Sequence, residues 1–159
     1  MSTEVSASII NEELDAINIS NELSQKYLLF VSDNIDFGVK ASYIIEIITN
    51  HHVTPLPLLP GYIKGIINLR GQIIPILDIR SKMGKAEGEY TNYSCIIVLD
   101  IDSVMVGIYV DTVSLVADID ESKISPPSPH NKQELVNGMV SMSDGKTLFL
   151  IDCEKLIEN

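Results

Sequence analysis

The pattern of apolar and polar positions predicts a chain of short strands joined by tight turns. It is clearest in residues 65–84, the stretch around which the rest of the chain is organised. Within residues 66–70 of that stretch, Ile67 and Leu69 share one face, and this period of two is typical of a half-buried strand. The opposite face carries Asn68 and Arg70.

A tight turn and a second strand follow within the same stretch. Gly71 can adopt the positive φ that a short hairpin needs. The apolar run 73–77 is expected to form a strand, and because Pro75 cannot donate a ladder hydrogen bond, that strand should lie at an edge or carry a bulge. Asp78 is expected to cap a short helical turn, which Gly84 ends.

The two halves of the chain repeat one layout. An opening glycine, a strand, a turn glycine, a second strand and an Asp occur in residues 65–78 and again in 138–152. Upstream, residues 37–48 resemble residues 106–117 in the same way. A repeat of roughly 65 residues with about five short strands is too small for a large sandwich. We therefore expect two small barrels packed together, since closing each sheet removes its edges and the interface enlarges the core.

The first 24 residues differ in texture from the remainder. They hold five acidic residues and no Lys or Arg, and their apolar residues have only a loosely helical spacing. We expect residues 1–24 to form a mobile acidic tail with one short helix, followed by a domain over 25–157. The first barrel is expected at about 37–92 and the second at about 93–150, with exchange of terminal segments between them left open.

Composition and charge limit the classes of partner. The hydrophobic content of 45% is enough for a core, and no run approaches the roughly 20 apolar residues of a membrane helix. The first ten residues lack the basic start and apolar core of a signal peptide. We expect a soluble, cytoplasmic protein in which Cys95 and Cys153 are reduced and buried. The net charge of −11 would repel phosphate backbones and anionic lipids, so nucleic-acid and membrane partners are not expected.

No pattern in the chain predicts an enzyme or a metal site. His51 and His52 are adjacent, so in a strand they point to opposite faces, and no Cys or carboxylate spacing completes a zinc site. Residues 145–147 resemble the end of a phosphate-binding loop, but Val140 stands where its first glycine would be. No Ser or Cys lies in an elbow-like turn with a His placed to activate it. We expect no catalytic residue, no metal and no cofactor.

Residues 63–80 resemble the signature of the CheW family, the bacterial chemotaxis coupling proteins. The features that match it arrive together in register: Gly65, Asn68, Leu69, Gly71, Pro75 and Asp78. The resemblance extends over about residues 25–157 and implies an all-β fold of two SH3-like five-stranded barrels with short capping helices. It also implies a non-catalytic adaptor at receptor arrays on the inner face of the membrane, joining the cytoplasmic tips of chemoreceptors to the regulatory domain of the histidine kinase CheA.

The resemblance also suggests where receptors bind. Carried over to matching positions, the family's receptor contacts lie near the groove between the barrels, at Ile44, Glu46 and Arg70, with Val113 a weaker candidate. Arg70 would orient the contact through a charge-assisted hydrogen bond, and Ile44 would supply apolar area. A solvated surface arginine is the simpler explanation of Arg70.

Other assignments stay open at this point. The loop 125–130 lacks the charged and aromatic residues expected where the family can meet the kinase, so the kinase-binding residues are not assigned. The same signature would suit an adaptor of another receptor-kinase pathway, such as surface motility. A small-ligand-binding barrel or a cryptic enzyme is the third hypothesis, and it would require a deep pocket with convergent polar groups.

Overall fold

The structure is a computed structural model that describes residues 7–20, 26–49, 51–85, 91, 93–127 and 135–158. The remainder of the predicted tail and residues 128–130 of the loop 125–130 lie outside the described residues. The elements in chain order are α1 (Ala7–Ser20), β1 (Lys26–Ser32), β2 (Ile35–Lys40), the 3-10 helix η2 (Ala41–Tyr43), β3 (Ile44–Thr49), β4 (Ile63–Leu69), β5 (Gln72–Asp78), α2 (Ile79–Lys82), β6 (Cys95–Ile101), β7 (Val104–Val110), β8 (Thr112–Asp118), η3 (Glu121–Lys123), β9 (Val136–Ser141), β10 (Thr147–Ile151) and α3 (Cys153–Leu156).

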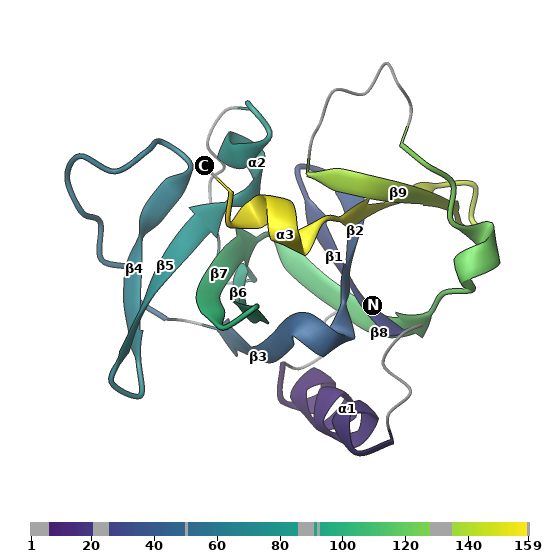
Figure 1. Ribbon diagram of the computed structural model, residues 1–159, viewed down its shortest axis with the longest axis horizontal. Coiled ribbons are helices and arrows are strands. Elements are labelled where there is room, and N and C mark those ends of the chain that lie inside the picture. The colour runs from purple at the N-terminus through teal and green to yellow at the C-terminus, as the bar shows by residue number, and fades with distance from the viewer. Residues whose placement is uncertain are drawn as a thin grey trace.

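The strands form two five-stranded sheets, which confirms the predicted all-β fold. The central sheet has the order β3-β6-β7-β5-β4, and the terminal sheet has the order β8-β1-β2-β10-β9. Figure 1 shows the central sheet on the left and the terminal sheet on the right. In the central sheet, the loop after edge strand β3 reaches the opposite edge strand β4 through the bridge between Thr54 and Ile66. In the terminal sheet, the loop after edge strand β8 reaches β9 through the bridge between Ser125 and Met139. These bridges close each sheet toward a barrel, which leaves less backbone edge unpaired.

The boundary predicted between the barrels is wrong, because the two repeats exchange strands. β2 was expected in the first barrel, but it pairs with β1 and β10 in the terminal sheet. β6 and β7 were expected in the second barrel, but they pair with β3 and β5 in the central sheet. The central sheet is thus continuous in sequence, from Ile44 to Val110, and the terminal sheet is built from both ends of the domain. The exchange of terminal segments that the sequence left open is present.

The predicted internal repeat is confirmed in three dimensions. Each copy ends in a hairpin followed by a helix of one turn, β4-β5-α2 in the first and β9-β10-α3 in the second. Asp78 accepts a hydrogen bond from the Arg80 N–H at 2.9 Å, and Asp152 accepts one from the Glu154 N–H at 3.1 Å. Both aspartates are therefore the N-caps that the sequence predicts.

Arg70 lies in the hairpin turn and not on the strand, contrary to the prediction. β4 ends at Leu69, and Arg70 and Gly71 form a two-residue turn with φ of +51° and +86°. Positive φ at both central residues is typical of the type I′ turn, whose twist matches that of the strands. The Asn68 side chain accepts a hydrogen bond from the Gly71 N–H at 3.0 Å. Asn68 and Gly71 thus have structural roles in the turn that presents Arg70.

The expectation that Pro75 places its strand at an edge is wrong. β5 lies inside the central sheet, between β4 and β7. Its pairing with β7 begins only at Ile76, so Pro75 belongs to the part of the strand that has a single neighbour. The pairing of β4 with β5 does contain a register shift, but the extra residue lies in β4, between Ile63 and Gly65, and not in the strand that contains Pro75.

Among the described residues the core has three parts, of which the largest joins the barrels. This central core combines buried residues of both sheets, such as Phe30 and Ile97, with side chains from all three α-helices. Phe30 and Phe37 stack there with ring centroids 5.4 Å apart. Smaller clusters fill the interior of each barrel. The shared interface therefore enlarges an otherwise marginal core, as the repeat predicts.

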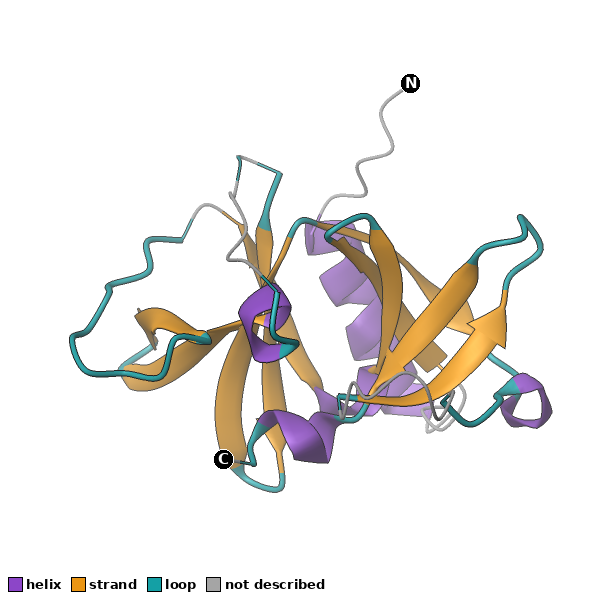
Figure 2. Ribbon diagram, turned by 90° about the horizontal axis from the view of Figure 1, so that it is seen from above, coloured by secondary structure: helices purple, strands orange, loops and turns teal. Residues whose placement is uncertain are grey.

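The N-terminal segment is packed on the domain over its described part, which differs from the predicted mobile tail. Residues 7–20 form α1, which lies between the two groups of strands in Figure 2. Ile10 and Leu14 are buried in the central core. Burial of these two side chains outweighs the poor helical pattern that the sequence offers.

Candidate functional site

Residues 63–80, the signature stretch, place Arg70 beside a carboxylate of the same chain. Its guanidinium donates a hydrogen bond to Glu46, which joins the β4–β5 turn to the edge strand β3. This hydrogen bond and the negative charge of Glu46 raise the pKa of Arg70, so the guanidinium stays charged. The Arg70 side chain is 73% exposed. Two predicted receptor contacts are thus brought together at the surface.

A β-bulge on β3 decides which side chains of this strand face outward. Ile44 lies opposite Leu99 of β6, whereas Glu46 lies opposite the adjacent Val98, so Ile45 is the extra residue. Ile44 is 4% exposed and belongs to the central core, and Ile45 is 46% exposed. The apolar contact area that the resemblance assigned to Ile44 is therefore offered by Ile45.

The second barrel repeats this bulge. Val113, the counterpart of Ile44, is buried in the central core, and a register shift makes Ser114 the extra residue of β8. Of the four predicted contacts, Glu46 and Arg70 meet at the surface, and Ile44 and Val113 hold the barrels together. An insertion into strand pairing has no mark in the apolar pattern, so the sequence could not reveal it.

Gly65 has a structural role in the signature stretch. A Cβ atom at this position would lie 2.2 Å from the carbonyl oxygen of Thr54. Thr54 and Ile66 exchange backbone hydrogen bonds of 2.8 and 2.9 Å at the same place. Gly65 thus permits the close approach of two backbones that closes the central barrel. Leu69, another residue of the signature, packs against the interior of the same barrel.

The β3 edge beside Glu46 also receives a contact that the sequence did not predict. The Asn11 side chain of α1 accepts a hydrogen bond from the Ile47 N–H at 3.0 Å and donates one to the Ile47 carbonyl at 3.3 Å. The weak amphipathic pattern of the N-terminal segment was the only signal for this contact. α1 therefore covers part of the surface next to the Arg70–Glu46 pair.

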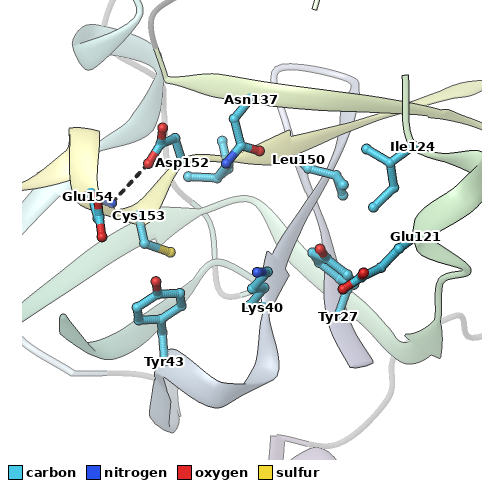
Figure 3. A pocket seen from close by; sticks show the side chains of 11 residues that line it. Tyr27, Lys40, Tyr43, Glu121, Ile124, Asn137, Leu150, Asp152, Cys153 and Glu154 are labelled. Carbon is cyan, nitrogen blue, oxygen red and sulfur yellow. Dashed lines mark hydrogen bonds between the residues drawn. The ribbon is translucent and has the colours of Figure 1, made fainter. Parts of the chain in front are cut away.

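A pocket of about 510 Å³ lies against the terminal sheet, between β1, β2, β10 and α3 (Figure 3). Lys40 and the carboxylates of Glu121, Asp152 and Glu154 face it. Burial raises the pKa of the Cys153 thiol to about 12, so this side chain is not an activated nucleophile. Within the described ranges, no group of three His, Cys, Asp or Glu side chains could hold a metal ion.

Comparison with known proteins decides the family. The family model of the CheW-like domain matches residues 26–159. The chain belongs to the CheW family. It is 32% identical to the chemotaxis protein CheW of Klebsiella aerogenes over 140 residues, which cover 86% of this chain and 84% of that protein. It is 30% identical to the CheW protein of Thermotoga maritima, over 88% of this chain and 86% of that protein.

A solved CheW structure has the same fold. The crystal structure of the scaffolding protein CheW from Thermoanaerobacter tengcongensis superimposes with a TM-score of 0.75 at 32% identity, covering 80% of this chain and 88% of that one. This CheW-family chain is a non-catalytic adaptor of chemotaxis signalling that couples chemoreceptors to the histidine kinase CheA. None of the helices in the described part of the chain is long and apolar enough to cross a membrane.

Proposed function

We propose that this CheW-family adaptor holds the cytoplasmic tip of a chemoreceptor at the surface formed by Ile45, Glu46 and Arg70. The observation that carries this proposal is the exposed ion pair between Arg70 and Glu46, beside an exposed aliphatic side chain. Arginine next to apolar area is a common composition for the energetic centre of an interface. The buried Ile44 and Val113 would act indirectly, by fixing the strands that carry this surface.

The backbone at Arg70 supports a role for its side chain. A type I′ turn favours Asn, Asp or Gly at this position, because φ is positive there. Arg70 adopts a φ of +51° although other residues would form the turn with less strain. Its guanidinium has five N–H donors, and the bond to Glu46 leaves others able to reach a partner's carboxylate or carbonyl. The turn thus presents a charged, partly pre-oriented donor to solvent.

The kinase is expected to bind elsewhere on the domain. An adaptor must hold both partners at once, so the regulatory domain of CheA would occupy a surface away from the Arg70–Glu46 pair. Individual contacts of this kind need only moderate affinity when many copies assemble at receptor arrays on the inner face of the membrane, because linked contacts raise the effective concentration.

Co-sedimentation with chemoreceptor-containing membranes tests this function. The purified full-length protein should sediment with membranes that contain the receptor and should carry CheA with it. Membranes without receptor are the control. Absence of the protein from the receptor pellet, together with failure to recover CheA, would contradict the proposal. The receptor and kinase recovered from the native lysate would identify the pathway, chemotactic or surface motility.

A further inference from the structure

The helix α1 covers the two edge strands on which the barrels meet. It contacts β3 of the central sheet and β8 of the terminal sheet. Figure 1 shows α1 beneath both strands, and Figure 2 shows it between the two groups of strands. We call the surface that α1 covers the β3/β8 surface. Ile10 and Leu14 are one helical turn apart, so they face the core together.

The β3/β8 surface has two equivalent walls. Ile47 of β3 and Val116 of β8 stand at matching positions of the internal repeat, and both belong to or pack against the central core. On the β3 wall, the Asn11 side chain of α1 exchanges hydrogen bonds with the backbone N–H and carbonyl of Ile47. The Asn11 amide therefore pairs with backbone groups of the edge strand β3 that a neighbouring strand could otherwise pair with. The surface thus accepts two aliphatic side chains and one amide from a helix.

α1 precedes the residues that the family model of the CheW-like domain matches. The family model begins at residue 26, after the helix, whereas β3 and β8 lie inside the match. The helix has 14 residues, among them β-branched, Asn and Ser residues of modest helix propensity. Helices of this length are marginal in water without tertiary contacts. Docking of α1 therefore depends on a small set of contacts, and the covalent connection to β1 keeps its local concentration high.

We propose that α1 is a displaceable occupant of the β3/β8 surface, and that an amphipathic helix of the receptor binds there in its place. The competing helix would present two aliphatic side chains one turn apart and a hydrogen-bonding side chain toward Ile47. This inference rests on the proposed function, because Ile47 directly follows Glu46 of the receptor-binding surface. The apparent affinity for the receptor is then the intrinsic affinity multiplied by the fraction of molecules in which α1 is undocked.

The test compares two double variants of the full-length protein. Ile10→Ser with Leu14→Ser removes the buried contacts of α1, and Ile9→Ser with Glu13→Ser alters its exposed face as the matched control. The probe is the purified cytoplasmic fragment of a chemoreceptor, titrated by calorimetry. The first variant should bind about tenfold tighter if α1 is docked in about 90% of molecules, and the control should bind like the wild type. A peptide of residues 7–20 should reverse the gain.

A milder variant covers the case in which the double variant fails to fold. Asn11→Ala removes the two hydrogen bonds to Ile47 and leaves the apolar contacts in place, so it should bind several-fold tighter than the wild type. In the wild type, amide exchange of α1 should become faster when the receptor fragment binds.

The outcomes separate this inference from the proposed function. If the wild type binds the fragment and the α1 variants bind equally or more weakly, α1 is a structural cover or part of the interface, and the inference is overturned alone. If neither the wild type nor the variants bind, the proposed function fails and the inference fails with it.

Discussion

Arg70 and Glu46 form an ion pair across 24 positions of sequence, with the arginine in the β4–β5 turn and the glutamate on the edge strand β3. The contact joins the tip of a hairpin to the strand that carries the outward-facing Ile45. Most of the Arg70 side chain is exposed, so solvent screens the attraction and the pair contributes little to folding. Binding and stability should therefore respond differently when these residues are changed.

Reversal of the charge at Arg70 should reduce binding without unfolding the domain. Arg70→Glu places two carboxylates together at the proposed receptor-binding surface, so co-sedimentation with the receptor should fall severalfold while Tm hardly moves. The double variant Arg70→Glu with Glu46→Arg restores an ion pair and should still bind poorly. Lys123→Glu, an exposed change in η3, is the charge control. Equal loss of Tm and binding, or recovery of binding in the double variant, would favour a purely structural role for the pair.

Ile44 and Ile45 should give opposite results although they are neighbours. Ile44→Ala leaves a cavity in the central core and should lower the free energy of unfolding by about 2–5 kcal/mol, as measured by urea denaturation. Ile45→Ser removes an exposed side chain and should change stability by less than about 0.5 kcal/mol. Receptor binding should be weakened by Ile45→Ser. If Ile44→Ala instead weakens binding with no loss of stability, the bulge does not orient β3 as described.

The two glycines of the signature stretch should tolerate asparagine differently. At Gly65 any Cβ would lie 2.2 Å from the Thr54 carbonyl oxygen, so Gly65→Asn should destabilise the domain by at least about 1–3 kcal/mol. At Gly71 there is open space and a φ of +86°, which Asn adopts more readily than other side chains, so Gly71→Asn should cost less than about 1 kcal/mol. Similar Tm values for both variants would contradict the close backbone approach at Gly65.

The thiols should be inert in the folded protein. Folding raises the pKa of Cys153 from 9.0 to about 12, mainly through burial, and burial also raises the pKa of Cys95. At pH 8 the thiolate fraction of Cys153 should be about a thousandfold lower than in the unfolded chain. A thiol reagent should therefore label both cysteines only on unfolding. Fast labelling of one thiol in the native state would contradict the burial of that residue.

The same shift predicts a dependence of stability on pH. Because the folded-state pKa of Cys153 is raised, its contribution to stability is complete below about pH 9 and is lost as pH rises toward 12. Urea denaturation of a Cys153→Ala variant should show a smaller decrease over this range than the wild type. An identical decrease in both proteins would contradict this assignment.

Local features of the fold followed from local sequence. The cap at Asp78, the turn at Gly71 and the β4–β5 hairpin around that turn each depend on residues close together in sequence, and all are present. The internal repeat was also readable, because both copies must satisfy the same turn and cap geometry. Its second copy lacks counterparts of Asn68 and Arg70, so these two side chains distinguish the first copy.

The candidate site was predicted only in part. Glu46 and Arg70 were each expected near the groove between the barrels and they meet at the surface, but Ile44 was expected to supply exposed apolar area and is buried. Strand alternation alone cannot locate a bulge, since the extra residue depends on the register imposed by β6. Asn11 was missed because its partner is the backbone of a strand 36 positions away.

The sequence by itself determined the strands, the turns, the capped helices and the family, because each depends on short-range geometry or on a signature in register. Only the tertiary structure decided how the repeats exchange strands, where Ile45 faces and where α1 docks. These features depend on which distant edges pair and which apolar surfaces remain to be covered. The stretch from Gly65 to Gly84 therefore builds the turn that carries Arg70, and the pairing of β3 with β6 places Glu46 beside it.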